Sequence, residues 1–279
     1  MRRNNNLRKK NSNKIEVLSK QNLILILVLF FLIIICILFN NVLNKSFNSV
    51  QAFAEFNQNF VNLNSNIPFS VDKIILYSNA TANAKTINFS FANLDISQYC
   101  DIGIYLKQLD ANSDISIKSL YINDISIIKP QVGTAYLYRK KVTDLGKASF
   151  SDSLIVDGQI NFNVVNSKDV NYDNYELLSD ASSPISIGYY NKNIKENYIA
   201  YVDNLAFDGT LLKDALIPTS DLSSKVSFTL NIIANDDEHY ICNISFDIPL
   251  EDENGTLYDN GYITKQINEE HISNFIRIK

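Results

Sequence analysis

The 279-residue chain contains little glycine and proline, no tryptophan and only two histidines. Its 8 Gly and 5 Pro exclude collagen-like and Pro/Gly-rich low-complexity chains. Hydrophobic residues make up 46% of the chain and charged residues 20%, so most of it can fold around a core. Asn and Ile occur 37 times each, a bias typical of AT-rich genomes, and clusters of Asn are therefore not interpreted as sites.

Charge is absent from one long segment near the N-terminus. Residues 23–39 are seventeen consecutive apolar residues, and Val42 and Leu43 extend the run past two Asn. At ~1.5 Å per residue the run forms a helix of about 26 Å, at the short end of what spans a bilayer. A buried helix of a globular protein usually keeps one polar face, and this segment has none. We therefore expect residues 23–43 to be a transmembrane helix in contact with lipid.

The flanking charges predict how this helix is oriented. Residues 1–22 carry seven Lys and Arg against one Glu, whereas only Lys45 and Glu55 follow the helix closely. Because positive residues stay on the cytoplasmic side, we expect residues 1–22 to be a basic cytoplasmic tail and the rest to be extracytoplasmic. Beyond the tail the chain has 18 basic and 29 acidic residues, and this acidic balance argues against a nucleic-acid partner.

The apolar segment is expected to remain in the protein as a signal anchor. A signal peptide needs small residues a few positions beyond its apolar run, and the nearest such pattern, Ala52-Phe53-Ala54, lies too far away. Ile35 precedes Cys36 where a lipoprotein signal needs a small residue. A cleaved signal peptide is the alternative.

A helical stalk is predicted over residues 44–67, where apolar residues recur at helical spacing: Val50, Phe53, Phe56, Phe60 and Leu63. Either the membrane helix continues outward or a separate helix lies on the membrane or on the domain. Self-association of this stalk is a further alternative, although two heptads are short for a coiled coil.

From Phe69 onward the apolar period changes to two, which predicts an all-β extracytoplasmic domain over residues 68–279. Its architecture is expected to be an antiparallel β-sandwich or jelly roll, with two smaller sandwiches divided in residues 166–184 as the alternative. Only Thr210–Leu216 is typical of a helix. The expected strands are 72–78, 86–91, 101–106, 116–128, 134–139, 154–156, 159–165, 185–190, 196–202, 225–233, 239–248, 256–258, 261–267 and 272–278.

Two of the three cysteines, Cys100 and Cys242, lie in the expected extracytoplasmic domain, where disulfides persist. A Cys100–Cys242 bridge and two buried free thiols are both compatible with their positions in strands. No CxxC pair or Cys/His spacing typical of zinc sites occurs, and no cofactor is predicted.

Catalytic patterns are scarce. The two histidines, His239 and His271, are expected in exposed positions beside acidic residues, and there is no G-x-S-x-G motif. Paired carboxylates such as Asp236 and Asp237 predict a glycan hydrolase only weakly, since such clefts often use Trp. Residues 251–255 are interpreted as a solvated acidic turn, with a calcium site as the alternative, because the EF-hand spacing is missing.

The longest strand-poor segment, residues 166–184, is the candidate binding loop. Its polar and aromatic contact residues would be Asp169, Tyr172, Asp173 and Tyr175, although an ordinary connection has the same composition. We therefore expect a non-enzymatic binding module at the cell envelope, with an envelope protein or glycan as partner. The alternatives are an extracytoplasmic glycan hydrolase and an assembly component that pairs through a β-edge.

Overall fold

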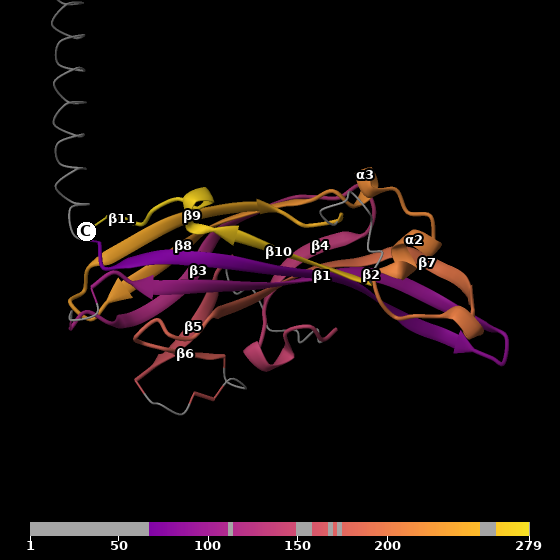
Figure 1. Cartoon of the computed structure of the whole chain (residues 1–279), viewed down its shortest axis with the longest axis horizontal. Coiled ribbons are helices and arrows are strands. Elements are labelled where there is room, and N and C mark those ends of the chain that lie inside the picture. The colour runs from indigo at the N-terminus through magenta and orange to yellow at the C-terminus, as the bar shows by residue number, and fades with distance from the viewer. Residues whose placement is uncertain are drawn as a thin grey trace, which may run out of the picture. The chain divides into compact units, whose positions relative to one another are not determined.

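The computed structural model describes residues 67–110, 114–148, 158–166, 170–171, 175–251 and 261–278. The predicted tail, transmembrane helix and stalk lie outside these residues, apart from Ile67. Within the described ranges, no helix is long and apolar enough to cross a membrane. The described part is all-β, as predicted, and consists of two sheets that face each other across one main core (Figure 1).

The first sheet, sheet A, has the strand order β10-β1-β2-β7-β4 and is antiparallel throughout. The second, sheet B, has the order β11-β9-β8-β3-β5-β6, and only β5 and β6 are parallel. Both sheets take strands from before and after residues 166–184. The strands of sheet A are β1 (Phe69–Ile87), β2 (Phe91–Gln108), β4 (Thr134–Arg139), β7 (Ile185–Tyr201) and β10 (Tyr262–Asn268). Those of sheet B are β3 (Ile117–Ile128), β5 (Ile160–Val165), β6 (Glu176–Leu178), β8 (Lys225–Ala234), β9 (His239–Asp247) and β11 (Ile276–Arg277).

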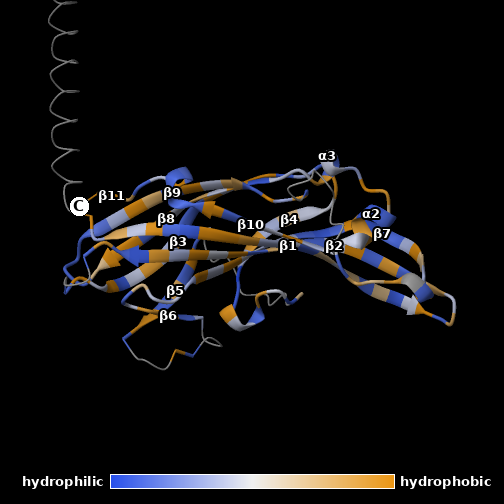
Figure 2. Cartoon of the chain, in the orientation of Figure 1, coloured by the Kyte–Doolittle hydropathy of each residue, from blue (hydrophilic) through white to orange (hydrophobic). Residues whose placement is uncertain are grey.

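The main core lies between the sheets because alternate residues of each strand point inward. Along β8, for example, Val226, Phe228, Leu230 and Ile232 are buried while Lys225 is exposed. Figure 2 shows the same alternation of hydrophobic and hydrophilic residues along the other long strands. The period-two pattern of the sequence therefore predicts which face of each strand is buried.

Sheet A is longer than sheet B, and two short helices cover the inner face of its extension. α2 (Thr210–Asp214) and α3 (Thr219–Leu222) contribute Leu211, Leu212 and Leu222 to a second core. The strands beneath them contribute residues such as Leu94 and Ile96. The helix predicted over Thr210–Leu216 is thus present, although it ends at Asp214.

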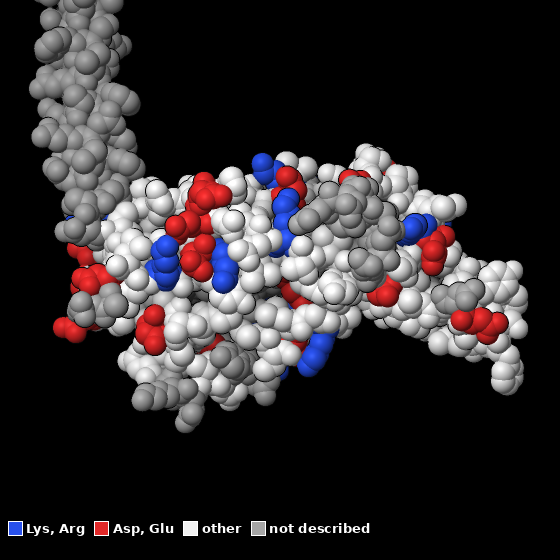
Figure 3. All heavy atoms as spheres, viewed as in Figure 1, with Lys and Arg blue, Asp and Glu red and all other residues white. Residues whose placement is uncertain are grey.

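Beyond this second core the β1–β2 hairpin projects as a finger (Figure 1). The strand predicted over residues 86–91, with Ile87, Phe89 and Phe91 facing inward, is wrong: these residues form the tip of the hairpin and their side chains are exposed. The reason is turn chemistry, because the Asn88 carboxamide oxygen accepts hydrogen bonds from the backbone N–H groups of Ser90 and Phe91. Figure 3 shows that the tip carries no charged side chain on the face in view.

Several other expected strands differ in extent. The expected strands 72–78 and 101–106 lie within the longer β1 and β2, and 185–190 and 196–202 together form the single strand β7. The expected strand 272–278 is shortened to β11, while the strands predicted at 154–156 and 256–258 lie outside the described residues. Short 3-10 turns complete the described elements: η1 (Val142–Asp144), η3 (Val202–Asn204) and η4 (Glu269–His271).

Candidate functional site

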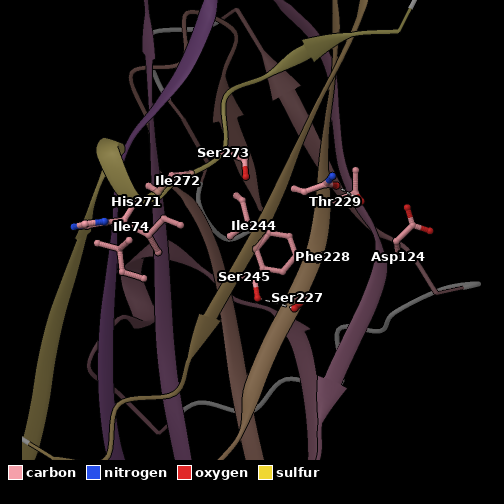
Figure 4. Close-up of a pocket in the computed structure, with 12 residues that line it drawn as sticks. Ile74, Asp124, Ser227, Phe228, Thr229, Ile244, Ser245, His271, Ile272 and Ser273 are labelled. Atoms are coloured by element: carbon pink, nitrogen blue, oxygen red, sulfur yellow. Dashed lines mark hydrogen bonds between the residues drawn. The ribbon is translucent and has the colours of Figure 1, made fainter. Parts of the chain in front are cut away.

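A cavity of about 420 Å³ lies beside strand β9 and is lined by residues of both sheets (Figure 4). Ile74 of β1 and Ile267 of β10 come from sheet A, and the segment after η4 contributes Ile272 and Ser273. The sheet B residues that line it are Asp124, Ser227, Phe228, Thr229, Asn243, Ile244 and Ser245. The cavity is therefore part apolar and part hydroxyl- and amide-lined.

The polar wall is a ladder of short side chains across β8 and β9. Ser227 lies opposite Ser245, and their hydroxyl oxygens are 2.8 Å apart. One step along the strands, the Thr229 hydroxyl donates a hydrogen bond of 3.0 Å to the Asn243 side-chain oxygen. Figure 4 shows Ser227 and Ser245 close together, below Phe228 and apart from Ile74 and Ile272. The wall offers hydrogen bonds without a net charge.

The same part of β9 is a sheet edge without a paired strand in the described ranges, and Ile272 and Ser273 line the cavity beside it. β11 pairs only with Ile241 and Tyr240, so β9 extends past the end of β11 on that side. The His239 carbonyl accepts a hydrogen bond from Ile278 N–H, which shows that the odd-numbered residues of β9 turn their backbone groups toward β11. Backbone direction alternates along an antiparallel strand, so Asn243 and Ser245 point their N–H and C=O groups outward, away from β8. Among the described strands, none pairs with these groups.

His271 stands at the rim of the cavity, in η4, directly before the expected strand 272–278. Its side chain is exposed and its Nε2 lies 3.6 Å from a carboxylate oxygen of Glu270. Ser227 and Ser245 bond to each other, and among the described residues no hydrogen bond joins His271 to a serine, as a Ser-His pair for nucleophilic catalysis would need. Asp124 is the single carboxylate among the lining residues.

His239 is not in the exposed position expected for it. It begins β9 and is partly buried on the outer face of sheet B, where its Nε2 lies 3.0 Å from the Asn231 side-chain oxygen. Burial lowers the pKa of this imidazole below its usual value. Asp237 forms an exposed ion pair with Lys118, and Asp236 accepts a hydrogen bond from Glu238 N–H, so this pair of carboxylates belongs to a turn.

Three of the four candidate binding-loop residues, Asp169, Tyr172 and Asp173, lie outside the described residues. The fourth, Tyr175, has a positive φ of 57° and packs against Arg139, whose guanidinium carbon is 4.0 Å from the ring centroid. Tyr175 does not line the cavity. Of the acidic turn at residues 251–255 only Glu251 is described, and no cluster of three or more potential metal ligands occurs in the described ranges.

Both cysteines of the domain are buried free thiols in the structure. Cys100 lies in β2 and Cys242 in β9, and both belong to the main core. The Cys242 thiol donates to the Ser273 carbonyl at 3.0 Å, and burial raises its pKa to about 12. Burial likewise raises the pKa of Cys100. Thiols in this state are poor nucleophiles.

The sequence reasoning missed the ladder residues at 227, 229, 243 and 245. Their signal is present, since they are the polar half of two alternating strands. What the sequence does not contain is the pairing that places them side by side at an open edge.

Comparisons with protein-family models, curated proteins and solved structures gave no match for this chain.

Proposed function

We propose that this chain is a single-pass membrane protein whose β-domain is a non-enzymatic binding module at the cell envelope. Residues 1–22 would be the cytoplasmic tail, residues 23–43 the uncleaved anchor and the β-domain extracytoplasmic. The uncharged apolar run and the excess of Lys and Arg before it support this topology.

The observation that carries the binding role is the open edge of β9 beside the cavity. An extended peptide can add to such an edge, because its backbone pairs with the outward N–H and C=O groups of Asn243 and Ser245. Alternate side chains of the peptide would then enter the cavity, where Ile74, Ile267 and Ile272 suit apolar groups. We therefore propose an extended segment of a partner protein as the ligand.

A glycan hydrolase has less support from the same geometry. Glycoside hydrolysis commonly uses two carboxyl groups on opposite sides of the scissile bond, at separations of about 5–9.5 Å. The described lining of the cavity provides Asp124 and no second carboxylate.

The test is binding of a random extended-peptide library to the full chain held in lipid nanodiscs, with a glycan array as the second arm. Two variants at position 245 distinguish strand addition from recognition through the side chain. Ser245→Pro removes the outward N–H, whereas Ser245→Ala removes only the hydroxyl. Strand addition predicts that selected peptides bind the Pro variant at least about tenfold more weakly, because a backbone hydrogen bond and the neighbouring pairing are lost.

The Ala variant is the matched control and should retain most of the peptide affinity, with the thermal unfolding of both variants measured beside it. Equal binding by all three proteins would contradict strand addition. If the chain binds glycans instead of peptides, and Ser245→Ala and Ser245→Pro weaken that binding equally, the polar ladder recognises sugars.

A further inference from the structure

A buried ion pair lies on the outer face of sheet A, away from the cavity. The Lys140 ammonium contacts Oδ1 of Asp101, and the two side chains are 1% and 2% exposed. Asp101 is in β2 and Lys140 follows β4, two strands that are separated by β7. The Lys140 side chain thus reaches across β7.

Gly188, in the strand between them, lies beneath an aromatic side chain. Gly188 pairs with Asp101 on one side and with Tyr138 on the other, and the Tyr138 ring lies directly over it. Tyr99, Tyr138 and Tyr190 form a buried aromatic cluster here, and the Lys140 nitrogen is 5.2 Å from the centroid of the Tyr99 ring. The pair is therefore enclosed by aromatic rings and shielded from water.

Enclosure of this kind disfavours charge. Desolvation by burial raises the pKa of Asp101 and lowers the pKa of Lys140. A buried ion pair often recovers less through mutual attraction than it loses in hydration. Transfer of one proton from Lys140 to Asp101 gives a neutral amine beside a neutral carboxylic acid, which are the two reactants of amide formation.

We propose that Lys140 and Asp101 join in an intramolecular isopeptide bond. The Nζ lone pair attacks Cγ of the protonated carboxyl group, and the C–N bond forms as the bond from Cγ to Oδ1 breaks. Oδ1 leaves with its own hydrogen and one proton from Nζ, so the products are a secondary amide and one water molecule. No oxidant, reductant or other co-reactant is needed.

The remaining hydrogen bonds fit the product. Gly146 N–H donates to Oδ2, the oxygen that stays as the amide carbonyl, and this donor also stabilises the negative charge that develops on Oδ2 during attack. Nζ donates to the Lys147 carbonyl at 2.9 Å, and the single hydrogen left on the amide nitrogen can keep that bond. The oxygen that leaves, Oδ1, is the one in contact with Nζ. Holding the two reacting groups in contact replaces an encounter in solution by a reaction within one molecule.

Two other ion pairs provide an internal comparison. Lys107 contacts Glu269 and Lys118 contacts Asp237, but these side chains are 39–74% exposed. Water keeps both partners of an exposed pair charged, so neither pair should form an amide. Burial, in addition to contact, sets Lys140 and Asp101 apart.

The test is peptide mapping of the purified full chain by mass spectrometry after denaturation and trypsin digestion. An acylated lysine is not cleaved by trypsin, so residues 86–107, which contain Asp101, should appear joined to the dipeptide Lys140-Lys141. The branched peptide should weigh one water molecule less than its two parts. Cleavage after Lys107 and Lys118 should remain complete.

Lys140→Arg and Asp101→Ala should each give unbranched peptides of full mass, while Lys141→Arg should leave the branch intact. The wild-type digest decides the question even if a variant fails to fold. Complete cleavage after Lys140, with residues 86–107 found only as a free peptide, would overturn the proposal and leave an ordinary buried ion pair.

Discussion

Gly188 shows how one missing side chain organises the outer face of sheet A. A Cβ atom at this position would lie 2.2 Å from the Tyr138 ring, so the close packing of the ring requires glycine. A position of this kind gives no signal in the sequence, because a single Gly in a strand has several common meanings.

Gly188→Ala is expected to lower the free energy of unfolding by about 1–3 kcal/mol, because Tyr138 must move out of a well-packed position. Chemical denaturation monitored by circular dichroism measures this loss. Gly103→Ala is the matched control on neighbouring β2, where the new Cβ would lie 3.3 Å from the Tyr105 side chain, which can move away. Equal losses in the two variants would contradict the packing argument.

Residue-scale prediction from the sequence is reliable where burial alternates and unreliable where a local hydrogen bond intervenes. Val226 and Phe228 are buried as their spacing indicates. Phe89 has the same spacing relative to Ile87 but is fully exposed, because the Asn88 side chain closes a turn there. Hydrophobicity alone cannot distinguish these two cases.

At the scale of elements, α2 is a single helical segment too short to be stable alone. It is held by packing, since Leu212 is fully buried in the second core whereas Leu216, just after the helix, is 87% exposed. The helix thus depends on β1 and β2 beneath it, which the sequence could not reveal from Thr210–Leu216 by itself.

Leu212→Ala is therefore expected to lower the free energy of unfolding by about 2–5 kcal/mol, the usual cost of a cavity in a core. Leu216→Ala should change it by no more than about 0.5 kcal/mol, as expected for an exposed site. Urea denaturation of both variants measures the difference. A large loss at Leu216 would show that the exposed side chain has a packing role.

Element boundaries were harder to predict than element type. The sequence predicts two strands, 185–190 and 196–202, where the structure has the single strand β7, and Asn193 and Asn197 adopt positive φ at irregularities within it. The bulged register between β2 and β7 accommodates them. The interior of each element was predictable, while its continuity depended on the neighbouring strand.

For the whole molecule, the fold class followed from the period-two pattern, but the strand order did not. In the described ranges, part of β9 has no paired strand on its outer side because its neighbour β11 is only two residues long. No local sequence pattern indicates that length. The candidate site lies at this edge, so it could not be located from the sequence. Its residues are ordinary Ser, Thr and Asn until the pairing brings them together.

The proposed topology predicts the outcome of proteolysis on intact cells. Protease added outside should remove the β-domain and leave a membrane-bound fragment that contains the basic tail, because the membrane keeps the protease from the tail and residues 23–43 hold the fragment in the bilayer. Immunoblotting with tags at each end measures this, and permeabilised cells are the control in which the N-terminal tag is also lost. Release of the full-length domain into the medium, or its protection in intact cells, would contradict the topology.

The long β1 strand also determines how the domain responds to force. β1 begins at Phe69, where the chain enters the domain, and pairs with β10 on one side and β2 on the other. Tension between Phe69 and the far end of β1 would run along the strand axis, so the flanking hydrogen bonds would bear the load in shear and rupture collectively. Rupture in shear needs a larger force than peeling a strand off one bond at a time.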